Sequence, residues 1–326
     1  MRTIRASGRV SGASRAAALL VAVSLTLQGA CTLRPSSFLD RPRVVAIETF
    51  LADITRAVAG PYLQVDALMP PGADPHAFEI TPGDVRRAAH SSLLIANGAG
   101  FDAALLSQLI NAAGDLSVVE AAAGIPLLQA PSPSQTAAPH EDGIRSPSDP
   151  HLWLDPNNVV HYVENIRAAL VQLDPIHEPE YAANAKDFAE QLVALDQWIR
   201  LEVHKIPPER RLLVTNHESL GYFASRYGFT IVGAIIPNLS SSASPSAQDL
   251  ARLIDALRAA RAPAIFLEMG ADPRLARQLA DESGVAVVTE LFTESLSPAD
   301  GPAPSYLEMM RFNTRTIVNA LATPGS

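Results

Sequence analysis

The sequence has a single cysteine, Cys31, among its 326 residues, which excludes a framework of disulfides within the chain. Basic residues are also few, because 25 Lys and Arg stand against 34 Asp and Glu and the formal net charge is −9. Nucleic-acid binding requires a basic face, so this composition argues against a nucleic-acid partner. The His-Glu-x-x-His motif of many zinc hydrolases is absent. The chain does have 48% hydrophobic residues, which is ample material for packed cores.

The longest apolar run is near the amino end, over residues 16–27. Four arginines and no acids precede it, which is typical of a secretory signal peptide, and we expect one over residues 1–30. The run is shorter than the roughly 20 residues of a membrane-spanning helix. Cys31 is the first residue after the expected signal peptide, and it resembles the lipid-modified cysteine of bacterial lipoproteins. We therefore expect an exported protein that is periplasmic, or lipid-anchored at Cys31 on the outer face of the cytoplasmic membrane through a tether over residues 31–43.

From residue 44 onward, short β-branched runs alternate with helical patterns, which predicts an α/β fold with mostly parallel sheets covered by helices. The first series has expected strands at 44–47, 65–68, 93–96 and 117–119, and expected helices at 50–59, 82–89 and 102–113. A segment rich in Pro, Ser and Ala, 130–150, reads as an exposed loop. The second series has expected strands at 212–215, 230–234, 264–267 and 285–288, and expected helices at 220–227, 247–260, 273–282 and 305–321.

One helical pattern stands apart from these two series by its length. It follows a helix expected to end near Leu173, covers residues 179–205, and stops at Pro207-Pro208. The pattern predicts two lobes joined by one long helix, and we expect a metal site in the cleft between the lobes, where candidate ligands from both halves can converge. The expected parts are an N-terminal lobe at 44–175, a linker helix at 176–207 and a C-terminal lobe at 208–326.

Four candidate metal ligands lie far apart in the sequence, each in a turn-like setting. His76 and His151 both end an Asp-Pro-His tripeptide, whose proline presents the next side chain from a rigid bend. His217 and Glu294 each follow an expected strand, and ligands of α/β proteins bind at the carboxyl ends of strands. Three imidazoles and one carboxylate form a complete tetrahedral shell for zinc. From the residues alone, a neighbouring glutamate, Glu218 or Glu290, could replace Glu294.

Four segments carry a resemblance to a known family. They are LMPPGADPH at 68–76, DPHLWLDP at 149–156, NHESLGYF at 216–223 and FTESL at 292–296. Together they resemble the zinc- and manganese-type substrate-binding lipoproteins of bacterial ABC importers. The resemblance implies that His76, His151, His217 and Glu294 are the metal ligands and that the linker helix is rigid. It also implies capture of a divalent metal outside the cytoplasmic membrane and delivery to an ABC permease, and we expect a monomer.

The ligand types bear on which metal is transported. Members of that family thought to carry manganese often have Glu at the third position, whereas His217 gives a nitrogen-rich shell that favours Zn²⁺. The fourth ligand of the family is more commonly Asp, so Glu294 adds a methylene group. We expect Zn²⁺ as the transported ligand, with Mn²⁺ as the alternative and iron after it.

Three other functions compete with metal transport. A secreted zinc hydrolase would need a water as fourth ligand and a general base such as Glu218 or Glu290, but a shell of four protein ligands leaves no open position for the water. Residues 98–103 imitate a dinucleotide-binding fingerprint, although a tight turn explains the same glycines. The third alternative is a surface adhesin, and no motif in the sequence tests it. We expect a binding protein and not an enzyme.

Overall fold

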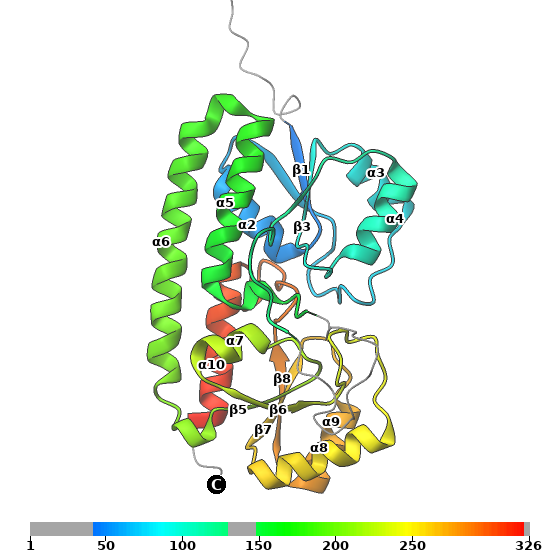
Figure 1. Ribbon diagram of the computed structural model, residues 1–326, viewed down its shortest axis with the longest axis vertical. Coiled ribbons are helices and arrows are strands. Elements are labelled where there is room, and N and C mark those ends of the chain that lie inside the picture. Colours follow the sequence, from blue (N-terminus) through cyan, green and yellow to red (C-terminus); the bar gives the residue numbers. More distant parts are fainter. Residues whose placement is uncertain (1–41, 130–147, 323–326) are drawn as a thin grey trace, which may run out of the picture. The chain divides into compact units, whose positions relative to one another are not determined.

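The computed structural model describes residues 42–129 and 148–322 of the chain. The expected signal peptide, Cys31 and nearly all of the tether lie outside these residues, as does most of the segment 130–150. The described chain contains two four-stranded sheets, with strand orders β2-β1-β3-β4 and β6-β5-β7-β8 (Figure 1). Every strand pair within them is parallel.

The first sheet belongs to the amino-terminal half of the described chain. Its strands are β1 (Arg43–Ala46), β2 (Gln64–Ala67), β3 (Leu93–Ala96) and β4 (Val118–Glu120), and the helices of this half are α2 (Thr49–Ala59), α3 (Pro82–Ala89), α4 (Ala103–Ala113) and α5 (Pro156–Leu173). Side chains of the central strand β1 alternate between two cores. Val44 and Ala46 pack in a cluster with α2 and α5, while Val45 packs in a cluster with Leu94 and residues of α3 and α4.

The second sheet has the same strand arrangement. Its strands are β5 (Leu212–Thr215), β6 (Thr230–Ala234), β7 (Ala264–Glu268) and β8 (Ala286–Leu291), and its helices are α7 (Gly221–Tyr227), α8 (Ala247–Ala260), α9 (Pro273–Ser283) and α10 (Tyr306–Ala322). Because β7 lies between β5 and β8, the carboxyl ends of these three strands are neighbours at one edge of the sheet. Two short 3₁₀ helices lie at the ends of the linker segment, η3 (Pro175–His177) and η4 (Pro208–Arg210).

The long helix predicted between the two series is α6 (Glu178–Val203), whose 26 residues span about 39 Å. Its buried stripe includes Tyr181, Phe188, Leu192 and Ile199. The helix packs against α2 and α5 from the first half and against α7 and α10 from the second, and Figure 1 shows it running beside α5. One apolar cluster contains residues of both halves, so the two sheets share part of their core.

The α/β class with two parallel sheets and one long helix is confirmed, whereas the boundaries given above for the lobes and the linker stay predictions. None of the helices in the described ranges combines the length and the apolar character that a membrane crossing requires.

Candidate metal centre

His76 lies in the loop that follows β2, at a turn made by its own tripeptide. Oδ1 of Asp74 accepts the backbone N–H of His76 at 2.8 Å, and Pro75 fixes the bend between them. The other carboxylate oxygen, Oδ2, accepts the hydroxyl of Ser241 at 2.6 Å. The side chain of His76 is 12% exposed, so the imidazole is near the surface.

His151 comes from the second Asp-Pro-His tripeptide, just before the 3₁₀ helix η2 (Leu152–Leu154). Oδ1 of Asp149 accepts the backbone N–H of His151 at 2.9 Å and also lies 2.7 Å from Nδ1 of the ring. The imidazole is completely buried. Gly221 at the start of α7 leaves room for this carboxylate, because a Cβ at that position would collide with Oδ2 of Asp149.

His217 and Glu294 come from the edge of the second sheet. His217 follows β5 and is completely buried, and its carbonyl oxygen accepts the hydroxyl of Thr215 at 2.6 Å. Glu294 follows β8, and its side chain is 6% exposed. The preceding residue, Thr293, accepts a hydrogen bond from Nε1 of Trp153 at 2.6 Å through its carbonyl oxygen. This bond ties the Glu294 loop to the first half of the chain.

The four side chains converge on one point. Oε1 of Glu294 lies 2.9 Å from Nε2 of His76, 3.3 Å from Nε2 of His151 and 3.1 Å from Nε2 of His217. The four potential ligand atoms all lie within 4.8 Å of one another. Among residues 42–129 and 148–322, this is the one cluster of three or more His, Cys, Asp or Glu with metal-binding geometry.

Contacts within the site shift the pKa values of His151, His217 and Glu294. Burial lowers the pKa of His151, but contacts with Asp149 and Glu294 outweigh it, and the net pKa lies above its ordinary value. Burial also lowers the pKa of His217, but the contacts with Glu268 and Glu294 outweigh it and raise the pKa well above the ordinary value. Burial would raise the pKa of Glu294, but the three imidazoles hold it well below its ordinary range. The Glu294 carboxylate is therefore ionised, and His151 and His217 bind protons more readily than an ordinary histidine does.

Aromatic side chains cover the side of the cluster that faces the first half. The ring of Phe101 lies 5.3 Å from that of His76 and 5.7 Å from that of His151, measured between centroids. Trp153 lies 5.3 Å from His151 and stacks on Phe50 at 4.5 Å. These rings exclude water from one side of the imidazoles, which strengthens electrostatic interactions at the site.

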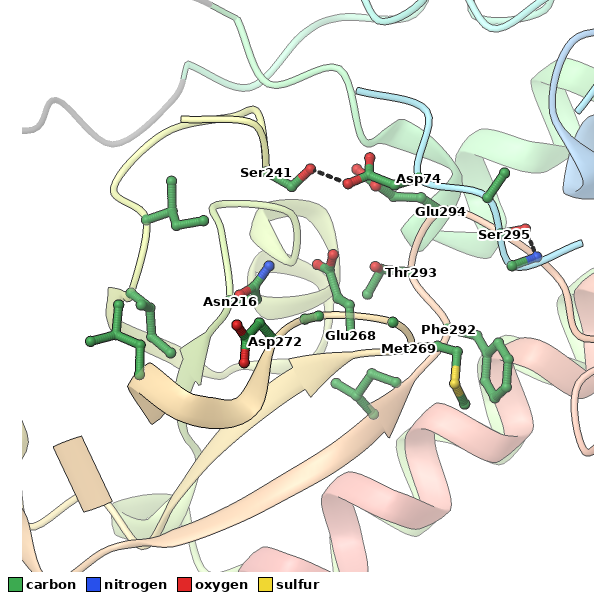
Figure 2. A pocket seen from close by; sticks show the side chains of 18 of the residues that line it. Asp74, Asn216, Ser241, Glu268, Met269, Asp272, Phe292, Thr293, Glu294 and Ser295 are labelled. Carbon is green, nitrogen blue, oxygen red and sulfur yellow. Dashed lines mark hydrogen bonds between the residues drawn. The ribbon is translucent and has the colours of Figure 1, made fainter. Parts of the chain in front are cut away.

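A cavity of about 730 Å³ lies beside Glu294, against the edge of the second sheet. Figure 2 shows Asn216, Glu268 and Thr293 around it, with the Asp74–Ser241 hydrogen bond close to Glu294. The cluster thus has aromatic rings against His76 and His151 and a cavity of mixed polar and apolar lining beside Glu294.

The structure brings together all four of the expected ligands, His76, His151, His217 and Glu294. The alternatives Glu218 and Glu290 are not members of the cluster. Cys31, the expected lipidation site, lies outside the described residues. The sequence reasoning missed Glu268, whose Oε1 lies 3.0 Å from Nδ1 of His217. Its position at the end of a strand, like that of His217, is the signal that could have found it.

Comparison with known proteins decides the family. The family described as "Zinc-uptake complex component A periplasmic" (ZnuA) matches residues 44–320. The chain belongs to the ZnuA family. It is 32% identical to the "Manganese-binding lipoprotein MntA" of Halalkalibacterium halodurans over 282 residues, covering 86% of this chain and 88% of the relative. It is also 32% identical to the "Iron-binding protein YfeA" of Yersinia pestis over 308 residues, covering 93% and 95%.

A solved structure shows the same fold. The "periplasmic zinc binding protein TroA" from Treponema pallidum superimposes with a TM-score of 0.76 at 29% identity, covering 87% of this chain and all of that one. Membership of the ZnuA family confirms a metal-binding substrate-binding component of ABC transport. It also confirms that the protein acts outside the cytoplasmic membrane and is not an enzyme. The names of the relatives include manganese, iron and zinc, so they leave the metal open.

Proposed function

We propose that the protein captures Zn²⁺ with His76, His151, His217 and Glu294 and delivers it to an ABC permease. The observation that carries this proposal is the convergence of three Nε2 atoms on one carboxylate oxygen. Three nitrogen donors and one oxygen donor are a common tetrahedral zinc shell. Oε1 of Glu294 stands close to the point where the metal would bind, so the carboxylate has to shift aside to become one vertex of the shell.

The distances support a site that needs little rearrangement. With zinc–nitrogen bonds of 2.0–2.1 Å, donor atoms of a tetrahedral shell are about 3.3 Å apart. The four donor atoms lie within 4.8 Å of one another, so they need to approach by at most about 1.5 Å. Rotations of the Glu294 and His76 side chains can supply such a movement.

Two features favour zinc as the cargo. The shell is richer in nitrogen than in oxygen, and oxygen-rich shells are the ones that suit the harder manganese ion. Divalent zinc also binds more tightly than manganese in most sites with nitrogen and oxygen donors. The alternative is manganese or iron transport by the same four ligands, which the names MntA and YfeA of two relatives support.

Delivery requires a permease and a place next to the membrane. We propose that Cys31 carries a lipid that holds the protein, as a monomer, at the outer face of the cytoplasmic membrane. The names of several relatives include the word lipoprotein, which supports an anchor of this kind. Mass spectrometry of the membrane-extracted protein tests it, since a Cys31→Ala variant should lack the lipid and be released in soluble form. An unmodified Cys31 in the mature protein would contradict the anchor.

Calorimetric titration of the metal-stripped protein with zinc, then with manganese, tests the metal assignment. Tight one-to-one zinc binding with much weaker manganese binding is the expected result. Manganese binding as tight as zinc binding would overturn the choice of metal and keep the transport function. No tight binding of either ion would contradict the site itself.

A further inference from the structure

Nδ1 of His217 is a buried nitrogen with no aligned hydrogen-bond partner among the described residues. Oε1 of Glu268 lies only 3.0 Å from it, so the distance suits a hydrogen bond although the direction does not. Buried polar atoms of proteins nearly always have a partner, so an unaligned pair at this distance calls for a reason.

Glu268 is held in place at the end of β7, the strand next to β5, which precedes His217. Its Oε1 also accepts the hydroxyl of Ser219 at 2.9 Å. The side chain is only 12% exposed and lines the cavity beside the cluster (Figure 2). The carboxylate therefore contacts the nitrogen of His217 that does not face Glu294.

A histidine that binds metal through one ring nitrogen usually donates the N–H of the other to a carboxylate or carbonyl oxygen. Asp149 already accepts Nδ1–H of His151 in this way. Nε2 of His217 is directed at Oε1 of Glu294, and this contact sets the present ring orientation. A small turn of the ring toward a metal would let Nδ1–H point at Glu268.

We propose that Glu268 is a positioning residue for metal binding, because it accepts Nδ1–H of His217 once the ring has turned onto the metal. This inference rests on the proposed function, in which His217 is a ligand. Glu268 fixes the proton on Nδ1 and leaves the lone pair of Nε2 free for the metal. No described side chain hydrogen-bonds to Nδ1 of His76, so the three ligand imidazoles are not equivalent.

The test uses calorimetric titration with zinc of the metal-stripped mature protein and four variants. Glu268→Ala removes the acceptor and should weaken zinc binding about 10–100-fold. Glu268→Gln keeps an oxygen acceptor without the charge and should recover part of this loss. Ser219→Ala keeps the carboxylate but removes the donor that holds it, so its loss should be smaller. Glu290→Gln changes the same charge on the exposed part of β8 and should bind like the wild type.

Nuclear magnetic resonance of the imidazole N–H groups separates positioning from general damage to the fold. The zinc-loaded wild type should show two slowly exchanging Nδ1–H protons, one from His151 and one from His217. Glu268→Ala should lose or strongly shift one of them and keep the other. This readout applies to the wild type by itself, so it decides the question even if Glu268→Ala fails to fold.

The possible failures are distinguishable. If the wild type binds zinc tightly and Glu268→Ala binds it as tightly as Glu290→Gln does, Glu268 has no positioning role and the proposed function stands. A wild type that shows no protected Nδ1–H proton from His217 when loaded overturns the inference in the same way. If the wild type binds neither zinc nor manganese, the proposed function and this inference both fail.

Discussion

The two Asp-Pro-His tripeptides have the same sequence but different surroundings. In both, the aspartate accepts the backbone N–H of the histidine, at 2.8 Å in one and 2.9 Å in the other. Asp149 also contacts the ring of its own histidine, whereas Asp74 uses its second oxygen to reach Ser241. His151 is fully buried and His76 is 12% exposed. The tripeptide therefore determines the turn, and the tertiary structure determines what holds the imidazole.

The two histidines therefore differ in how firmly their rings are held. In the proposed site, the ring of His151 is held by Asp149, and the ring of His217 has Glu268 beside it. The proposed ligand His76 lies instead on a surface loop that is connected to the second half by the Asp74–Ser241 hydrogen bond. We expect metal to enter and leave on the His76 side.

Removal of either histidine of the pair should have the largest effect. His76→Ala and His151→Ala should each weaken zinc binding by more than the roughly 100-fold that loss of an outer contact can cause. His151→Ala should also lower the free energy of unfolding by about 2–4 kcal/mol, because it leaves a cavity and removes the ring that contacts the buried Asp149 carboxylate. Calorimetric zinc titration and urea denaturation measure the two quantities.

His161→Ala is the matched control, since His161 is an exposed residue of α5. It should leave both quantities unchanged. Equal unfolding free energies for the His76 and His151 variants would show that the two tripeptides do not differ as described.

A change of pH should have the next largest effect. Protonated imidazoles do not bind metal, and contacts with acids raise the pKa of His151 and of His217 above the ordinary value of 6.5. Zinc affinity should therefore be highest above those raised values and should fall as the pH drops through them, by about tenfold per unit for each proton displaced. Competition with a zinc-binding dye between pH 8 and pH 5 measures this. An affinity that begins to fall only below pH 6 would contradict the raised values.

Replacing each aspartate in turn tests directly whether Asp149 and Asp74 support their histidines differently. Asp149→Asn weakens the support of the His151 ring and should reduce zinc affinity about 10–100-fold. Asp74→Asn changes an aspartate that contacts only the backbone of its histidine, so it should cost less than tenfold. The same titration measures both. Equal losses in the two variants would mean that ring support by Asp149 has no special value.

The smallest expected effect comes from removing the hydrogen bond between Ser241 and Asp74, next to His76. Ser241→Ala removes the hydrogen bond to Asp74 and should speed zinc release a few-fold, with a change in unfolding free energy of about 1 kcal/mol or less. Ser240→Ala is the control, because the hydroxyl of Ser240 bonds to Ser242 and not to Asp74. Stopped-flow transfer of zinc to a chelator gives the release rates. Identical rates in the two variants would show that the connection does not restrain the His76 loop.

Much of this arrangement could be predicted from the sequence. Alternating strand and helix patterns locate every strand of both sheets to within a few residues, because their apolar periods are clear. The Asp-Pro-His turns and the strand ends single out His76, His151, His217 and Glu294. These signals are local, and each can be read from a few neighbouring residues.

Other parts of the site depend on contacts that no local pattern shows. Glu268 lies beside His217 because β7 inserts between β5 and β8, an order that differs from the order along the chain. Asp74 reaches Ser241 across a separation of 167 residues. Phe101 and Trp153 lie against the imidazoles only because the fold brings them there, and no local pattern predicts those contacts.

X-ray absorption spectroscopy at the zinc edge of the zinc-loaded protein tests the four-ligand site most directly. The account predicts a four-coordinate metal with three imidazole nitrogens at about 2.0–2.1 Å and one carboxylate oxygen at about 2.0–2.2 Å. The Glu294→Ala variant should lose the protein oxygen and keep three imidazoles. A shell with fewer than three imidazoles, or one unchanged by Glu294→Ala, would contradict it.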